Sequence, residues 1–499
     1  MNPFQLPEEI QDRSTYDRAV AHLREAGIRL PLLSELTNAP QALNDVYEKL
    51  NQVHADAPDP RNLYRVHWFN DRARTGLTDT PEFVRLPKAL TGVDAQIIVA
   101  LGDRFPMIGA HKVLAAYGCL VPRLVSGAFD PDHHRAVWPS TGNYCRGGIA
   151  ISRILGCHGV AVLPEGMSRE RFSWLEKWVS DPQDIVRTPG TESNVKEIYD
   201  KCEQLSRDPQ NIIVNQFSEF SNYLVHRLVT GNALDRIFQS VSTSLPNARL
   251  AGFIAATGSA GTLGAGDHLK SRYGTRIVAV EPVECPTLLY NGFGEHNIQG
   301  VGDKHVPLIH NVMNTDFVVG VSDYDSDGIN ALFNTPAGRN YLHQRKGISA
   351  EILDALTSLG FSGIANVLAA IKLAKYLSLG PEDVLITVAT DGSALYQTEL
   401  QKWLSLEAPE GVDETLSAEL YGAHLKNVRV DHLLELTEID RNRIFNLGYY
   451  TWVEQQGINI QDFERRRHQT FWNQLERLIP TWDAMIEAFN QETAQSRNA

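Results

Sequence analysis

The sequence predicts an α/β protein whose parallel sheets are covered by helices on both faces. Between Phe83 and about Leu400, short apolar runs rich in β-branched residues alternate with amphipathic helical patterns. This alternation is typical of βαβ units, in which the strands are buried on both faces. The strands are expected at residues 95–101, 159–163, 212–214, 250–256, 276–280, 317–321 and 384–389.

The two ends of the chain have a different pattern from this central part. Residues 1–75 are polar and rich in helix and loop signals, so we treat them as an N-terminal extension. After residue 400, Leu, Glu, Arg and Trp recur at helical spacing, which predicts an α-helical appendage over residues 401–499. Aromatic residues at this spacing, such as Trp472 and Trp482, are expected in a core rather than at a ligand.

The composition excludes several classes of protein. With 43% hydrophobic and 21% charged residues, and without an uninterrupted apolar run of membrane-spanning length, the chain is typical of a globular protein that does not insert into membranes. A net charge of −14 argues against nucleic acid as a partner, because a phosphate backbone would be repelled. The basic run at Arg465, Arg466 and Arg467 is expected to be a solvated helix face.

The cysteines and the N-terminus indicate a reducing compartment. Five cysteines are scattered without C-x-x-C spacing, so we expect neither a disulfide framework nor a metal site. The first nine residues lack the basic start and the apolar segment of a secretory signal. A cytoplasmic location is therefore expected.

Three short segments carry residue types that suit a covalently bound, phosphorylated cofactor. A lysine in apolar surroundings can form a Schiff base when its pKa is lowered, and Lys112 has apolar neighbours on both sides. A glycine-rich turn between an apolar run and a helix can hold a phosphate on backbone amides. A turn of amides can likewise hold a carboxylate. The segments are Gly109-Ala110-His111-Lys112, Ser140-Thr141-Gly142-Asn143 and Gly258-Ser259-Ala260-Gly261-Thr262.

The order and spacing of these segments identify a family resemblance. Lys112 and Asn143 are 31 positions apart, about one α/β crossover, and the glycine-rich turn follows after several further elements. From about residue 80 to about residue 400, the chain resembles the fold type II pyridoxal phosphate (PLP) enzymes of the cysteine-synthase and tryptophan-synthase-β superfamily. Further matching stretches lie at residues 155–165, 215–217, 279–282 and 296–302.

The resemblance implies a two-lobed core with the cofactor between the lobes. The PLP-dependent core would span residues 76–400, with a small lobe over about 115–230 and a large lobe over about 76–114 and 231–400. Enzymes of this fold are commonly homodimers, so we expect a homodimer by analogy.

The resemblance also assigns roles to individual residues. Lys112 would be the catalytic Schiff-base lysine, and His111 would donate to the cofactor phosphate. Asn143 would meet the 3-hydroxyl of the cofactor ring. The phosphate would be held by Gly258, Ser259, Ala260, Gly261 and Thr262, and the carboxylate of a small amino-acid substrate by Ser140, Thr141, Gly142, Asn143 and Gln216.

At one position the expected site differs from the family pattern, and at another the sequence leaves two candidates. Ala260 stands where relatives usually have glycine, which is tolerable if its φ is negative. The pyridine nitrogen would meet either Thr390, whose hydroxyl would leave it largely unprotonated, or Asp391, whose carboxylate would keep it protonated. A Rossmann dinucleotide loop is a competing interpretation of the glycine-rich turn, although the G-x-G-x-x-G spacing is not met.

The implied function is that of a PLP-dependent lyase or β-replacement enzyme acting on a small β-substituted amino acid, through external aldimine and aminoacrylate intermediates. The alternatives are an ammonia-lyase of the threonine-dehydratase or diaminopropionate type, and a non-catalytic PLP-fold scaffold or effector-binding protein. Cysteine synthases usually have Asp-Arg directly after the lysine, whereas Val113 and Leu114 follow here, so the specific substrate stays unassigned.

Overall fold

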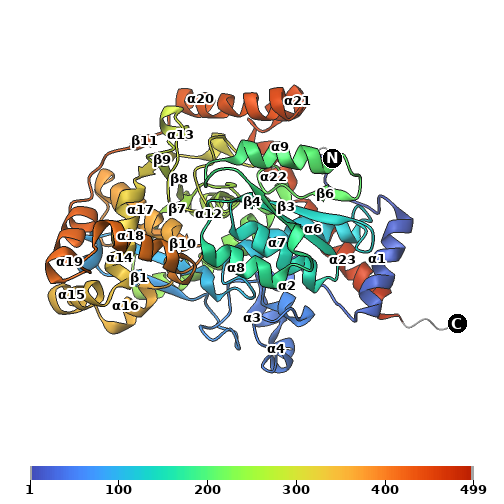
Figure 1. The fold of residues 1–499 in the computed structure, drawn as a ribbon, viewed down its shortest axis with the longest axis horizontal. Coiled ribbons are helices and arrows are strands. Elements are labelled where there is room, and N and C mark those ends of the chain that lie inside the picture. The colour runs from blue at the N-terminus through green and yellow to red at the C-terminus, as the bar shows by residue number, and fades with distance from the viewer. Residues whose placement is uncertain (1–2, 496–499) are drawn as a thin grey trace.

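The structure is a computed structural model that describes residues 3–495, and it contains two separate sheets with helices packed around them (Figure 1). Seven strands form the larger sheet in the order β1-β2-β10-β7-β8-β9-β11, and four form the smaller sheet in the order β5-β4-β3-β6. Only the two edge strands of the larger sheet, β1 and β11, pair antiparallel with their neighbours. The strands are β1 (Phe83–Leu86), β2 (Gln96–Leu101), β3 (Arg135–Pro139), β4 (His158–Pro164), β5 (Ile185–Thr188), β6 (Asn211–Ile213), β7 (Arg249–Ala256), β8 (Arg276–Pro282), β9 (Phe317–Val321), β10 (Asp383–Ala389) and β11 (Leu433–Glu435).

Helices connect the parallel strands and cover the sheets. Those before and around the smaller sheet are α1 (Arg13–Glu25), α2 (Leu33–Thr37), α3 (Ala39–Ala42), α4 (Asn44–Leu50), α5 (Lys88–Thr91), α6 (Lys112–Val125), α7 (Asn143–Ile154), α8 (Arg169–Trp178), α9 (Val195–Ser206), α10 (Phe220–Val225) and α11 (Gly231–Ser244). The larger sheet is followed or covered by α12 (Leu263–Tyr273), α13 (Thr287–Tyr290), α14 (Asp323–Asn334), α15 (Pro336–Lys346), α16 (Ala350–Leu356) and α17 (Phe361–Tyr376). The last segment holds α18 (Gln397–Glu407), α19 (Glu414–Tyr421), α20 (Glu438–Tyr449), α21 (Ile460–Arg465), α22 (Gln469–Leu475) and α23 (Leu478–Ala494).

The expected α/β class is confirmed, and each of the seven expected apolar runs coincides with a strand. Strands β1, β3, β5 and β11 were not among those runs. They are short, and each except β11 carries an arginine, so hydrophobic periodicity alone does not separate them from loops. The expected limits of the lobes, at residues 115 and 230, stay a prediction.

The segment after residue 400 is mostly helical, as expected, but it is not wholly so. Strand β11 pairs with β9 and so completes the edge of the larger sheet. Trp472 and Trp482 are fully buried, which places these aromatic side chains in the core. The expectation of a solvated basic face is wrong for Arg466, which is buried, donates to the Leu308 carbonyl at 2.7 Å and lies over the Phe463 ring.

The two ends of the chain pack against each other. Helix α1 lies beside α23 (Figure 1). Asp483 of α23 accepts hydrogen bonds from the backbone N–H groups of Leu33 and Ser34 at 2.7 and 3.0 Å, which satisfies orphan donors at the start of α2. The Asn490 side chain both donates to and accepts from the backbone of Leu30. The N-terminal and C-terminal extensions therefore form one joint layer.

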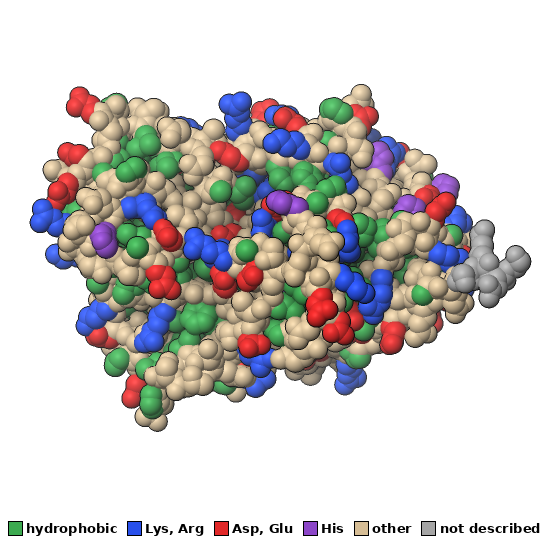
Figure 2. Space-filling model, turned by 90° about the horizontal axis from the view of Figure 1, so that it is seen from below, with side chains coloured by type: hydrophobic (Ala, Val, Ile, Leu, Met, Phe, Trp, Pro, Cys, Tyr) green, Lys and Arg blue, Asp and Glu red, His purple; other side chains and the backbone are tan. Residues whose placement is uncertain are grey.

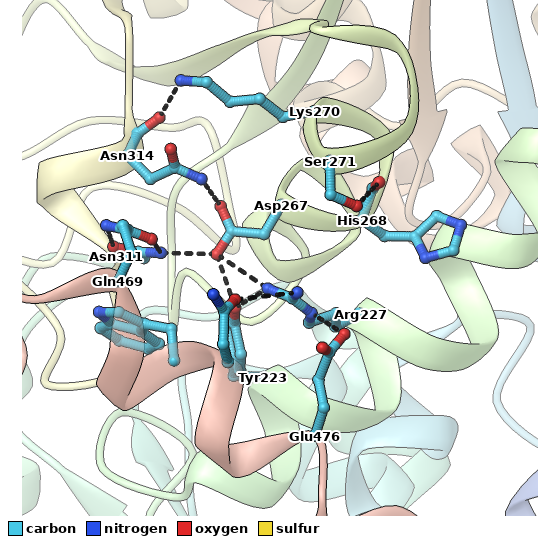
Figure 3. Close-up of polar contacts among 12 residues, drawn as sticks. Tyr223, Arg227, Asp267, His268, Lys270, Ser271, Asn311, Asn314, Gln469 and Glu476 are labelled. Carbon is cyan, nitrogen blue, oxygen red and sulfur yellow. Dashed lines mark hydrogen bonds and ion pairs between the residues drawn. The ribbon is translucent and has the colours of Figure 1, made fainter.

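A buried polar cluster joins the C-terminal segment to the larger sheet's helices (Figure 3). At its centre, the Asp267 carboxylate of α12 accepts hydrogen bonds from the Tyr223 hydroxyl at 2.6 Å and from the amides of Asn311 and Asn314 at 2.7 Å each. Next to it, Arg227 pairs with Glu476 in the turn before α23. These contacts fix the position of the C-terminal segment relative to α12 and the larger sheet.

The outer surface carries both signs of charge. On the face shown in Figure 2, basic and acidic side chains are interspersed. Among residues 3–495, no single helix is long and apolar enough to cross a membrane, although α16 and α17, bent by 116° relative to each other, together pass that test by length and composition.

Candidate active site

Lys112 opens helix α6 and points into a cavity between the two sheets. Its Nζ donates to Ser259 Oγ at 3.1 Å and to Gln216 Oε1 at 3.4 Å. Burial disfavours the ammonium form and lowers the pKa of Lys112 to about 8, although the nearby Asp303 opposes this shift. An amine with this pKa is a far better nucleophile near neutral pH than an exposed lysine.

The glycine-rich turn lies between β7 and the N-terminus of α12, opposite Lys112. A Cβ atom at position 258 would lie 2.3 Å from the Gly300 carbonyl oxygen, and one at position 261 would lie 2.3 Å from Asn222 Oδ1. Both positions therefore require glycine. The amides of the turn and the dipole of α12 form a site for an anion.

Ala260 does not meet the condition of a negative φ under which alanine is easily tolerated. Its φ is +65°, in the left-handed region that favours glycine. The turn therefore has the backbone conformation that a glycine would adopt, and this conformation is strained for alanine because of its Cβ atom.

His111 lies behind the turn and is fully buried. Its Nε2 is 3.3 Å from Thr262 Oγ1, and the Trp68 ring stacks on it with a centroid distance of 5.4 Å. Burial lowers the pKa of His111 well below its usual value, so the ring is neutral. Its Nδ1 has no hydrogen-bond partner. Trp68, from the N-terminal extension, was not expected at the site, because a single tryptophan in a polar segment gives no signal of its partner.

The Ser140–Asn143 segment joins β3 to α7 as a tight turn. Ser140 Oγ accepts the Gly142 N–H at 3.0 Å, and Gly142 has a φ of +152°. A Cβ atom at position 142 would lie 2.6 Å from Arg171 Nε, so the close approach of that arginine requires glycine. The turn thus presents backbone amides at the start of α7.

The structure places Thr390 and Asp391, the two candidates for the pyridine nitrogen, in different surroundings. Thr390 lies on the cavity wall. The Asp391 carboxylate instead accepts hydrogen bonds from Asn143 Nδ2 at 2.6 Å and the Tyr396 hydroxyl at 2.9 Å, and lies 3.9 Å from Arg171 Nη2. Asn143 Oδ1 in turn accepts from Arg146 at 2.9 Å. Asn143 is thus held between a buried carboxylate and a buried guanidinium.

Most of the residues expected at the site line one cavity, and the others lie directly next to its wall. His111, Gly142, Gly261 and Asp391 are the neighbours that do not line it. Those that do are Lys112, Ser140, Thr141, Asn143, Gln216, Gly258, Ser259, Ala260, Thr262 and Thr390. Within the described residues, no group of three or more His, Cys, Asp or Glu side chains could hold a metal ion.

Sequence reasoning missed four polar residues around this cavity: Arg171, Glu192, Gln299 and Asp303. Gln299 and Asp303 line it, and Arg171 contacts both Gln299 and the Tyr396 hydroxyl. Glu192 accepts the Gly300 N–H at 2.5 Å. The matching stretch at residues 296–302 was a signal for Gln299 and its neighbours, whereas nothing local marks Arg171 or Glu192 as buried.

A protein family described as "Pyridoxal-phosphate dependent enzyme" matches residues 74–326, about half of the chain. The chain belongs to this family. It is a PLP-dependent enzyme of the fold type II, cysteine-synthase superfamily, so a dinucleotide loop and a non-catalytic scaffold are no longer supported.

Curated relatives agree with this assignment. The chain is 31% identical over 255 residues to a cysteine synthase B of Campylobacter jejuni, which covers 50% of this chain and 74% of the relative. It is 24% identical over 332 residues to cystathionine beta-synthase of Saccharomyces cerevisiae, which covers 64% of this chain and 61% of the relative.

Solved structures share the fold. An O-acetylserine sulfhydrylase isoform 3 of Entamoeba histolytica aligns with a TM-score of 0.52 at 22% identity, covering 69% of this chain and 93% of that chain. An O-acetylserine dependent cystathionine beta-synthase of Helicobacter pylori aligns with a TM-score of 0.51 at 19% identity, covering 64% and 95%.

The residues present fit PLP. An amine of lowered pKa lies within reach of a turn whose two glycines admit no Cβ atom, and the buried His111 beside that turn has an unpaired Nδ1. An aldehyde for the amine and a phosphate for the turn are the two groups that this arrangement suits.

Proposed function

We propose that the enzyme catalyses β-replacement or β-elimination on a small amino acid that carries a leaving group on Cβ. The observation that carries the proposal is the position of Lys112, whose amine faces the same cavity as the amide turn of Ser140–Asn143. An amino acid whose carboxylate binds that turn would present its α-carbon to the lysine. The names of the curated relatives, cysteine synthase B and cystathionine beta-synthase, support β-replacement.

Each part of the cavity has a task in this proposal. Lys112 would bind the cofactor aldehyde, and the turn from Gly258 to Thr262 would hold the phosphate. Ser140, Thr141, Gly142 and the Gln216 amide would hold the substrate carboxylate. When bound, PLP supplies an electron sink for charge that develops at the α-carbon. The Lys112 amine would remove the α-proton, for which a pKa of about 8 is well matched to neutral pH.

We propose further that Thr390, rather than Asp391, faces the pyridine nitrogen. Thr390 is on the cavity wall, whereas the Asp391 carboxylate is directed at Asn143 and Tyr396. A hydroxyl at the nitrogen would leave it largely unprotonated, which suits elimination of a good leaving group. Asp391 would then be a positioning residue that orients Asn143.

The test uses the protein reconstituted with PLP and the variant Lys112→Ala, with the exposed Lys177→Ala as the matched control. The wild type and the control should be yellow, lose the colour with borohydride, and carry the reduced cofactor on Lys112 in a peptide map. O-Acetylserine should give product with an added nucleophile, or pyruvate and ammonia without one. A threonine or 2,3-diaminopropionate preference would instead favour the ammonia-lyase alternative, and a colourless wild type would overturn the proposal.

Assembly and location are also proposals. By analogy with enzymes of this fold we propose a homodimer, which light scattering of the purified holoenzyme would test. The buried free cysteines are consistent with a reducing, cytoplasmic location, which fractionation of cells would test.

A further inference from the structure

Next to the cavity that holds Lys112 lies a cleft whose charged side chains are nearly all acidic. Gln299 belongs to the wall of both the cavity and the cleft, so the two spaces adjoin at this residue. Six carboxylates and a single lysine line the cleft; the carboxylates are Glu192, Glu295, Asp323, Asp327, Glu399 and Glu407. The lysine, Lys402, is exposed and lies 3.8 Å from Glu399. The cleft therefore carries a net negative charge.

Two carboxylates near the junction are buried and incompletely paired, which singles them out from the other acids. Glu192 is 1% exposed, and its Oε2 has no hydrogen-bond partner, while Thr141 and the Gly300 amide hydrogen-bond to the carboxylate. Asp303 is 4% exposed, lines the cavity, and has no partner for either oxygen. Burial of a carboxylate without a hydrogen-bond partner lowers the stability of the fold unless a bound ligand supplies that partner.

The nearest cations do not neutralise this pair. The Arg171 guanidinium attracts Glu192, but it also donates to Tyr396 and contacts Gln299 and Asp391. Lys112 is the only cationic side chain on the wall of the cavity, within residues 3–495, and its amine is committed to the cofactor. His296 in the cleft is buried, which lowers its pKa, so it adds no charge at neutral pH.

We propose that the nucleophile added to Cβ is a primary amine that enters this cleft as a cation, such as a diamine or the side-chain amine of a basic amino acid. The inference rests on the proposed function and specifies its second substrate. The negative cleft would attract a cationic amine and repel an anionic nucleophile such as hydrosulfide. Glu192 and Asp303 would bind its ammonium group next to the site of attack.

Glu192 supplies the proton acceptor that an ammonium ion needs before it can attack. Burial raises the pKa of Glu192 to about 7, so its carboxylate is partly ionised near neutral pH and accepts a proton more readily than an exposed carboxylate. The ammonium gives one proton to a carboxylate, and its freed lone pair forms the C–N bond at the Cβ that the leaving group has vacated. Lys112 returns the α-proton to Cα. The leaving group departs as its anion, the proton taken up by the carboxylate passes to water, and no oxidant or reductant is needed.

The first experiment compares acceptors on the holoenzyme with O-acetylserine as the donor. With 1,3-diaminopropane the kcat/KM should exceed that with hydrosulfide at least tenfold. It should fall steeply between 0.01 and 1 M salt, because the screening length shrinks from about 30 to about 3 Å. Glu192→Gln and Asp303→Asn should each lower kcat/KM for the diamine at least tenfold more than they lower kcat/KM for hydrosulfide.

The matched control is Glu281→Gln, which removes a buried carboxylate on β8 that accepts the N–H groups of Leu288 and Leu289, outside the cleft. It should leave the preference between acceptors unchanged. Binding is measured separately by calorimetry with N,N,N′,N′-tetramethyl-1,3-diaminopropane, a dication that cannot form an imine with the cofactor. Its affinity should fall at least tenfold in Glu192→Gln.

The outcomes separate this inference from the proposed function. Product with hydrosulfide but none with amines, or equal affinity for the tetramethylated dication in the wild type and Glu192→Gln, would overturn the amine assignment and leave β-replacement in place. A protein that binds PLP but converts no β-substituted amino acid with any acceptor would overturn the proposed function and, with it, the identity of the second substrate.

Discussion

Asn143 Nδ2 donates to Asp391 Oδ2 at 2.6 Å, although the two residues are 248 positions apart in the chain. The bond crosses from the start of α7, next to the smaller sheet, to the loop after β10 of the larger sheet. The proposed cofactor site lies between these sheets. The distance between the sheets at this point is therefore set partly by a buried, charge-assisted hydrogen bond.

Asp391→Asn should weaken PLP binding about tenfold, because a charged hydrogen bond contributes about 1.5–3 kcal/mol and the variant keeps only a neutral one. The position of the visible absorbance band should not move, because Thr390 rather than Asp391 is proposed to face the ring. Titration of the apoprotein with PLP measures both quantities. Asp325→Asn, which removes a carboxylate paired with His424 elsewhere, is the control. A shifted band in Asp391→Asn would place the carboxylate at the pyridine nitrogen.

Ala260→Gly should stabilise the protein by up to about 1 kcal/mol. A left-handed backbone costs a residue with a Cβ atom about 1–2 kcal/mol, and the greater freedom of glycine in the unfolded chain offsets part of the gain. Urea denaturation of the apoprotein measures the change. Ala265→Gly in helix α12 is the matched control and should destabilise, because its backbone is helical and its methyl group is buried. Destabilisation by both changes would contradict the assigned φ.

The rate of reconstitution with PLP should rise with pH and level off above about pH 8. Only the neutral Lys112 amine attacks the aldehyde, and burial lowers the pKa of that amine to about 8. Asp303→Asn should shift the midpoint to lower pH, because the Asp303 carboxylate favours the ammonium form. Stopped-flow absorbance measures the rate constant. A rate that still increases tenfold per pH unit above pH 9 would mean that the lysine titrates like an exposed one.

Asp267→Ala should destabilise the protein by about 3 kcal/mol or more. It leaves the buried hydroxyl of Tyr223 and the amides of Asn311 and Asn314 without their shared acceptor. Glu476→Gln should cost about 1 kcal/mol or less, because the Glu476 side chain is 43% exposed and its pair with Arg227 is partly solvated. Chemical denaturation compares the two variants. Equal losses would contradict a buried centre at Asp267.

Much of the fold could be predicted because strands buried on both faces have an apolar signature of their own. The runs at residues 250–256 and 384–389 became neighbouring strands β7 and β10, although more than a hundred residues separate them. The three expected segments met at one cavity because each follows or ends a buried element. Lys112, Asn143 and Thr262 lie at or beside helix starts, where backbone amides and polar side chains are free to face a ligand.

Other parts of the site depend on long-range burial, which no local pattern reports. Glu and Asp residues are usually exposed, so the burial of Glu192 and Asp303 becomes visible only in the three-dimensional structure. The sequence did not predict the positive φ of Ala260, because the shape of the turn overrides the preference of its side chain. Strand β11 is three residues long, so its pairing with β9 left no periodicity to detect.

The joint layer made by the two ends of the chain limits how far the protein can be shortened. Removal of residues 401–499 would leave β9 as an unpaired edge strand and would remove α23 from its contacts with α1 and α2. Exposed strand margins and apolar helix faces promote aggregation, so a version trimmed to the family-matching half should precipitate on expression. Any affinity tag or fluorescent fusion also has to leave the first and last helices free to meet.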